Sequence, residues 1–201
     1  MFYIEEPVID AGSDAPRLQS AIRECGVWVV IPHLPTGLTA AETDATLGAL
    51  IDRLFVEQGI DAYVAWYYTP MAVSFTRHLK PLATVYDCMD ELSAFRGAPS
   101  IMRHNERELL AHADVVFTGG QSLFAAKQHC HSRVHLYPSS VDVPHFARAR
   151  KPLDDPADQF DIPHPRIGFY GVIDERMDLD LLASVAGMRP DWQIVMIGPV
   201  A

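Results

Sequence analysis

The amino-acid sequence predicts an α/β protein built on a parallel sheet. Between residues 62 and 137, short apolar runs that are typical of strands alternate with longer amphipathic runs that are typical of helices. The strand runs are continuously apolar, as in parallel strands that helices cover on both faces. Together these observations predict a doubly wound, Rossmann-like sheet.

The first three runs of the chain are expected to be strands. Residues 1–6 form a short apolar-rich run. Residues 17–23 and 27–31 flank Cys25 and Gly26, and the second of these runs is rich in Val and aromatic residues, which predicts a β-hairpin. A helix is the alternative for residues 17–23, because their apolar positions also fit helical spacing.

The best-marked helix is predicted for residues 39–58. Thr39 can cap its start together with Glu42, three residues later, as a capping box. Gly59 is expected to end it. Its apolar residues fall on one face: Leu47, Leu50, Ile51, Leu54 and Phe55.

Strands and helices alternate after this helix. The predicted strands are residues 62–66, 82–86, 115–118 and 134–137, and the predicted helices are residues 70–79, 101–112 and 122–131. A further strand, helix and strand are predicted at residues 166–170, 179–186 and 192–197.

The pattern divides the chain into three parts. Residues 1–146 are expected to form one α/β domain. Residues 147–165 are polar and rich in proline, which suits a linker between domains. Residues 166–201 are expected to begin a second Rossmann-like domain, because one strand-helix-strand unit has too little core to fold alone.

Composition excludes several classes of function. The 201 residues are 49% hydrophobic and 21% charged, which is typical of globular proteins. The net charge of -10 argues against nucleic-acid binding, which needs clustered Lys and Arg. No secretory signal or membrane-spanning run is apparent, which predicts a cytoplasmic protein. The histidines and three widely spaced cysteines predict neither a disulfide framework nor a metal site.

The segment from Gly171 to Asp178 joins a predicted strand to a predicted helix. Gly171 would let a phosphate approach the backbone, and the helix N-terminus would favour its negative charge. Arg176 could add a bidentate contact to a diphosphate. The alternative is an ordinary turn in which Asp178 caps the helix and Arg176 lies on the surface.

Two further segments follow predicted strands and carry candidate site residues. In the first, Asp87, Asp90 and Glu91 could act as acid or base, orient a sugar hydroxyl or hold a cation, or they could cap the next helix. In the second, Gly119 and Gly120 permit close approach of a ligand to the backbone. Ser122 is either the cap of the next helix or a ligand contact.

Two motifs resemble those of family 4 glycosyltransferases with the GT-B fold. Residues 137–146 resemble the family's P-N-G-V-D-x-x-x-F signature, with two serines in place of Asn-Gly. Residues 171–182 resemble its G-R-x-x-x-E-K-G-x-D-x-L motif. The resemblance implies that Gly171 and Arg176 stand where the family places its diphosphate-contacting Gly and Lys, whereas Val172 replaces the family's Arg.

The whole chain resembles a bacterial subgroup of group 1 glycosyltransferases similar to the teichuronic-acid biosynthesis transferases. Shared segments include E-E-P, P-H-L-P, W-Y-Y-T-P-M-A, V-Y-D-C-M-D-E-L-S, F-T-G-G-Q-S-L and G-F-Y-G-V-I-D-E-R. The resemblance implies transfer of a sugar, with retained anomeric configuration, from a nucleotide-diphosphate sugar to a polysaccharide or glycolipid acceptor. It implies no cofactor and no metal. It also implies peripheral association of the full-length enzyme with the inner face of the membrane.

Family members usually carry an earlier strand and helix, and their E-x7-E motif would lie beyond residue 201. The chain is therefore expected to be a fragment that is inactive alone. A non-catalytic nucleotide- or sugar-binding module is the alternative function. A Rossmann oxidoreductase is disfavoured, because no G-x-G-x-x-G follows any predicted strand.

Overall fold

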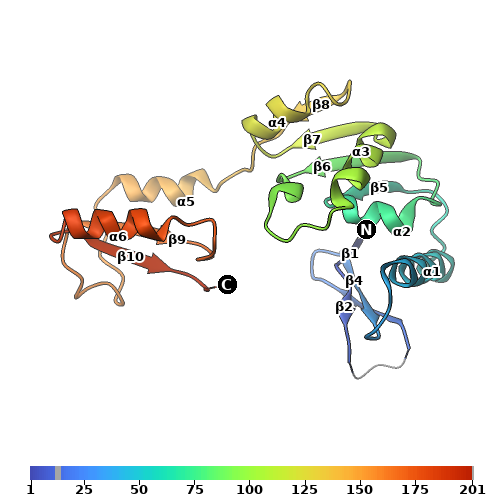
Figure 1. Cartoon of the computed structure of the whole chain (residues 1–201), viewed down its shortest axis with the longest axis horizontal. Coiled ribbons are helices and arrows are strands. Elements are labelled where there is room, and N and C mark those ends of the chain that lie inside the picture. Colours follow the sequence, from blue (N-terminus) through green and yellow to red (C-terminus); the bar gives the residue numbers. More distant parts are fainter. Residues whose placement is uncertain (12–14, 201) are drawn as a thin grey trace. The chain divides into compact units, whose positions relative to one another are not determined.

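The computed structural model describes residues 1–11 and 15–200 (Figure 1). It contains two compact units, with the division between Ser140 and Val141. Unit 1 holds two four-stranded sheets, and unit 2 holds a two-stranded sheet. The predicted α/β class, with parallel strands alternating with helices, is confirmed. The domain boundaries at residues 146 and 165 stay a prediction.

The first sheet of unit 1, sheet A, is centred on β4. Its strands are β1 (Phe2–Ile4), β2 (Val8–Ile9), β3 (Arg17–Ile22) and β4 (Trp28–Leu34). Strands β1 and β2 pair with β4 in parallel, and β3 pairs with it antiparallel. The hairpin is therefore confirmed and the helical alternative for residues 17–23 is wrong. Gly26 makes the tight turn, with a φ of 81° that side chains disfavour.

Helix α1 (Ala40–Gln58) has the predicted caps. The Thr39 side chain accepts a hydrogen bond from the Glu42 amide, and the Glu42 carboxylate accepts one from the Thr39 amide at 2.8 Å. Gly59 ends the helix in the left-handed conformation. The apolar face of α1 packs on β4, where Leu34, Leu47 and Leu50 form a buried cluster. The capping box and this face together explain why the prediction matches the structure.

The second sheet of unit 1, sheet B, is fully parallel. Its order is β5 (Val64–Tyr67), β6 (Ala83–Cys88), β7 (Val115–Thr118) and β8 (Val134–Leu136). The connecting helices are η1 (Pro70–Ala72), α2 (Val73–Thr76), η2 (Leu92–Ala94), α3 (Met102–His112) and α4 (Gln121–Lys127). The helices predicted for residues 70–79 and 122–131 exist but are shorter.

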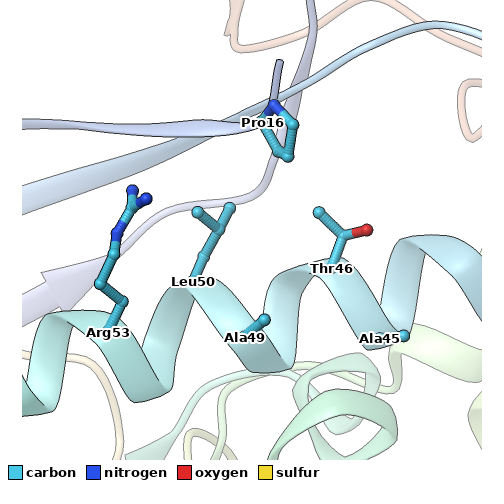
Figure 2. Close-up of a pocket in the computed structure, with 6 residues that line it drawn as sticks. All are labelled: Pro16, Ala45, Thr46, Ala49, Leu50 and Arg53. Atoms are coloured by element: carbon cyan, nitrogen blue, oxygen red, sulfur yellow. The ribbon is translucent and has the colours of Figure 1, made fainter.

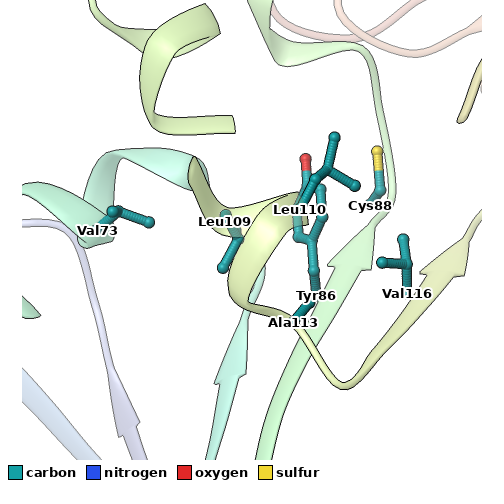
Figure 3. Packing of buried hydrophobic residues seen from close by; sticks show 7 residues of the cluster. All are labelled: Val73, Tyr86, Cys88, Leu109, Leu110, Ala113 and Val116. Atoms are coloured by element: carbon teal, nitrogen blue, oxygen red, sulfur yellow. The ribbon is translucent and has the colours of Figure 1, made fainter. Parts of the chain in front are cut away.

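One face of sheet B carries the larger core of unit 1. Side chains from α2, β6, α3 and β7 meet there (Figure 3). Complete burial of Val116 contributes about 1.5–3 kcal/mol relative to an exposed side chain. On the other face Val64 and Trp66 of the edge strand β5 are 54% and 50% exposed, whereas Val85 of β6 is buried. This face is therefore partly exposed at β5. The cluster residues are Val73, Tyr86, Cys88, Leu109, Leu110, Ala113 and Val116.

Unit 2 is a single strand-helix-strand unit preceded by two short helices. It consists of α5 (Val143–Ala147), η3 (Arg148–Arg150), β9 (Arg166–Tyr170), α6 (Leu179–Met188) and β10 (Gln193–Ile197). Strands β9 and β10 pair in parallel. Within residues 141–200 no side chain is buried. No helix in the described part of the chain is both long and apolar enough to span a bilayer.

Candidate functional site

Two of the predicted site segments lie next to each other at the carboxyl edge of sheet B. The first follows β6 and the second follows the neighbouring strand β7. A Cβ on Gly119 would lie 3.1 Å from the carbonyl oxygen of Met89, so the glycine permits this close approach. Asp87 and Cys88 belong to β6 and not to the loop, which begins at Met89. Strand β6 extends this far because Asp87 and Cys88 pair with the last two residues of β7.

The Asp87 carboxylate lies on the partly exposed face of sheet B beside aromatic side chains. The Trp66 indole donates a hydrogen bond to Asp87 at 3.3 Å. The Trp66 ring also packs against Phe117, with ring centroids 5.6 Å apart, and Phe117 contacts Tyr137. Sequence reasoning missed these aromatic residues. The sequence signal that could have found them is their position, since each stands at or near the end of a predicted strand and these strands are neighbours in a parallel sheet.

Glu91 takes part in a largely buried ion cluster. The Lys127 ammonium contacts Glu91 at 2.9 Å and Glu106 at 2.8 Å, and Tyr86 donates a hydrogen bond to Glu106 at 3.0 Å. Burial acts to raise the pKa of Glu91, but the hydrogen bond and charge of Lys127 outweigh it, so this pKa lies below its ordinary value. Burial likewise acts to lower the pKa of Lys127, and the two carboxylates raise it overall. Glu91 is thus ionised and paired, which suits positioning of the loop better than proton transfer.

Asp90 is the third carboxylate of this segment and is exposed. Its side chain accepts a hydrogen bond from the amide of Glu91 at 2.9 Å. The Cys88 thiol, which is buried, contacts the backbone carbonyl of Asp90 at 3.6 Å. Asp90 therefore stabilises the turn after β6. Asp87 differs from Asp90 and Glu91 because its hydrogen-bond donor is the half-exposed Trp66 side chain on the partly exposed face of the sheet.

Gly120, not Ser122, occupies the N-cap position of α4. Gly120 has an extended backbone and provides no side-chain cap. Ser122 lies within the first turn, so the prediction that it caps the helix is wrong. The helix begins one residue earlier than predicted, at Gln121.

In unit 2, Gly171 and Gly198 follow β9 and β10 and lie against each other. Their φ angles are 147° and 149°, and a Cβ on Gly198 would overlap the carbonyl group of Gly171. Only glycine fits at Gly198. Asp178 caps α6, as the sequence predicted, by accepting a hydrogen bond from the Leu181 amide at 2.9 Å.

Arg176 is 58% exposed and bound to a neighbouring carboxylate. Its guanidinium donates to Asp174 at 2.6 Å and 3.0 Å. These hydrogen bonds from Arg176 place the pKa of Asp174 below its ordinary value. A diphosphate that contacts Arg176 must therefore compete with Asp174.

A surface depression in unit 1 lies between Pro16 and α1 (Figure 2). Its lining is mostly apolar, and none of the predicted site residues contributes to it. Within residues 1–11 and 15–200, no group of three or more His, Cys, Asp or Glu side chains is arranged to hold a metal. The lining residues are Pro16, Ala45, Thr46, Ala49, Leu50 and Arg53.

Comparison with known proteins gives no family assignment. No protein-family model matches the chain, and a search of curated proteins finds no match. The motifs and the site geometry are therefore what bears on function.

Proposed function

We propose that this chain is part of a GT-B glycosyltransferase. The enzyme transfers a sugar from a nucleotide-diphosphate sugar to a polysaccharide or glycolipid acceptor, with retention of anomeric configuration. The observation that carries the proposal is the meeting of the segments after β6 and β7 at the carboxyl edge of sheet B. Ligands of open α/β sheets bind at this edge. The two motifs that resemble family 4 glycosyltransferases support the same proposal.

Each proposed role follows from a residue's surroundings. Asp87, on the partly exposed face of sheet B, accepts a hydrogen bond from an acceptor hydroxyl. Gly171 and the first turn of α6 bind the donor diphosphate, because a helix N-terminus favours anions. Arg176 exchanges Asp174 for a phosphate oxygen and stabilises the charge that develops as the diphosphate leaves. In the transfer, the bond from the sugar's anomeric carbon to the diphosphate breaks, the acceptor oxygen bonds to that carbon, and the hydroxyl proton passes to the departing phosphate.

A non-catalytic nucleotide- or sugar-binding module is the second candidate. The pairing of Glu91 with Lys127 and of Arg176 with Asp174 favours it, because these groups already have partners. Such a module needs only the backbone groups of the glycine-containing turns and the aromatic side chains beside Asp87. It binds a nucleotide sugar without transferring the sugar.

Binding and transfer assays separate the two candidates. The intact gene product that carries this sequence is titrated with UDP-, GDP- and dTDP-sugars by ligand-observed NMR, and transfer is followed with a radiolabelled sugar. Saturable binding with transfer supports the transferase. Binding of a nucleotide sugar without transfer to any polysaccharide or glycolipid supports the module. Absence of binding to all nucleotide sugars contradicts both.

A further inference from the structure

A second depression in unit 1, of about 450 Å³, lies between η2 and α3. It adjoins the segment that follows β6, because Glu91 belongs to both. The lining residues are Glu91, Ser93, Ala94, Arg103, Glu106 and Arg107. Three of these come from the segment after β6 and three from α3.

The carboxylates of this depression are already neutralised in part. Lys127 forms ion pairs with both Glu91 and Glu106, and Ser93 donates a hydrogen bond to Glu91 at 3.0 Å. The side chain of Lys127 is only 9% exposed, so its charge acts in surroundings that screen it weakly. The three charges sum to about -1, which leaves little repulsion toward an incoming anion.

The other charges of the depression are two arginines on one face of α3. Arg103 and Arg107 are one helical turn apart, and the Arg107 side chain donates to the Arg103 carbonyl at 3.3 Å. Neither guanidinium lies within ion-pair distance of a carboxylate of the described residues, and the charge of Arg103 acts on Glu91 from beyond that distance. Together with the Lys127 cluster they make the depression about +1, although the whole chain carries -10.

The start of α3 adds to this positive field. The helix has 11 residues, its first turn holds no acidic side chain, and Ile101 at the N-cap position provides no side-chain hydrogen bond. The first turn of α3 thus supplies no carboxylate of its own against the positive end of the helix dipole. Arg103 lies in this first turn.

We propose that this depression binds a phosphate group, with Arg103 and Arg107 as its donors. Guanidinium groups match phosphate oxygens in pairs of parallel hydrogen bonds. Assignment of this phosphate to the acceptor of the transfer reaction rests on the proposed function. Both a phosphorylated saccharide and a lipid phosphate headgroup carry this chemistry.

NMR titration with inorganic phosphate tests the site directly. Saturable shifts are expected at the Ser93 and Ala94 amides, with affinity at least about tenfold weaker in the double variant R103Q/R107Q. R96Q is the matched control, because Arg96 is exposed in the same segment, outside the lining. Both replaced arginines are exposed, and circular dichroism verifies the fold. Absence of saturable shifts at Ser93 and Ala94, or equal affinity in wild type and R103Q/R107Q, overturns the proposal.

Vesicle binding distinguishes the two sources of phosphate. Phosphatidylglycerol vesicles that bind the wild type but not R103Q/R107Q assign the site to a lipid headgroup. Phosphate shifts without vesicle binding assign it to a soluble phosphorylated ligand. UDP-sugar binding is measured in the same variants. A variant that loses phosphate binding but still binds the UDP-sugar shows that the phosphate site and the donor site of the proposed function can be tested separately.

Discussion

Units 1 and 2 have the same local design but differ in burial. Both contain parallel strands with connecting helices, and in each unit one helix, α1 or α6, begins at a side-chain cap. Every buried hydrophobic residue of the described chain lies in unit 1. In unit 2 even Phe169 and Leu181 are exposed. Local pattern and caps are thus sufficient to specify strands and helices, whereas stability has to come from burial.

The largest expected effect is loss of core packing in unit 1. Leu109→Ala should lower the free energy of unfolding by about 4 kcal/mol, because Leu109 is buried in the cluster of Figure 3. Leu181→Ala in the exposed part of α6 should change it by less than about 0.5 kcal/mol. Urea denaturation followed by circular dichroism measures both. Equal costs for the two variants would refute the contrast between the units.

The next largest effect is expected at the Lys127 cluster of unit 1, whose lysine is 9% exposed. Lys127→Met leaves the Glu91 and Glu106 carboxylates unpaired and should cost about 3 kcal/mol at neutral pH. The folded pKa of Glu91 lies below the ordinary 4.5, so its contribution is present above that pH and is lost on acidification. The folded pKa of Lys127 lies above 10.5, so its contribution is lost as the pH rises through that folded value.

The free energy of unfolding, measured as a function of pH, tests the directions of these two pKa shifts. The difference in the free energy of unfolding between wild type and Lys127→Met should be largest between about pH 4.5 and 10.5 and should shrink outside that window. A difference that is constant from pH 3 to pH 11 would show that Lys127 acts through packing alone.

A smaller effect is expected at the helix caps, where the units can be compared at one interaction. Thr39→Ala removes the capping box of α1 and should lower the unfolding free energy of unit 1 by about 1 kcal/mol. Asp178→Ala removes the same kind of hydrogen bond from α6. Because α6 has no buried residue, we expect the loss to appear as reduced helix content of α6. Hydrogen exchange of the two helices distinguishes a global from a local response.

The smallest effect on stability is expected at Arg176. Arg176→Gln breaks an exposed ion pair with Asp174 and should change stability by less than about 0.5 kcal/mol. Affinity for the nucleotide sugar should nevertheless fall about tenfold, since one charged phosphate contact is lost. Arg189→Gln, which breaks a similar exposed pair with Asp191, is the control. Equal donor affinity in both variants would remove Arg176 from the proposed site.

The sequence predicted those elements that short-range signals define. The caps of α1, the cap of α6 and the positions of β7 and β9 follow from residues within a few positions of each other. The end of α4 was not predicted, because the helix ends at Lys127, before the expected residue 131. The Lys127 side chain pairs with Glu91, 36 positions earlier, a contact that the local pattern does not contain. The extension of β6 through Asp87 likewise depends on pairing with β7.

The candidate site was predictable to a similar extent. The neighbourhood of the two segments after β6 and β7 follows from parallel topology, because carboxyl ends of adjacent strands share an edge. The partners of individual side chains depend on tertiary contacts. Examples are the hydrogen bond from Trp66 to Asp87 and the use of Glu91 in an ion cluster.

Sugar transfer by the intact gene product, with and without Asp87→Asn, tests the proposed function most directly. The wild type should transfer sugar from a nucleotide-diphosphate donor. Asp87→Asn should reduce the turnover rate about tenfold with donor affinity unchanged, because the hydrogen bond to the acceptor hydroxyl loses the carboxylate charge that strengthens it. Asp61→Asn, at an exposed position before β5, should leave turnover unchanged. Full activity of Asp87→Asn, or no transfer by the wild type with any nucleotide sugar, would contradict the account.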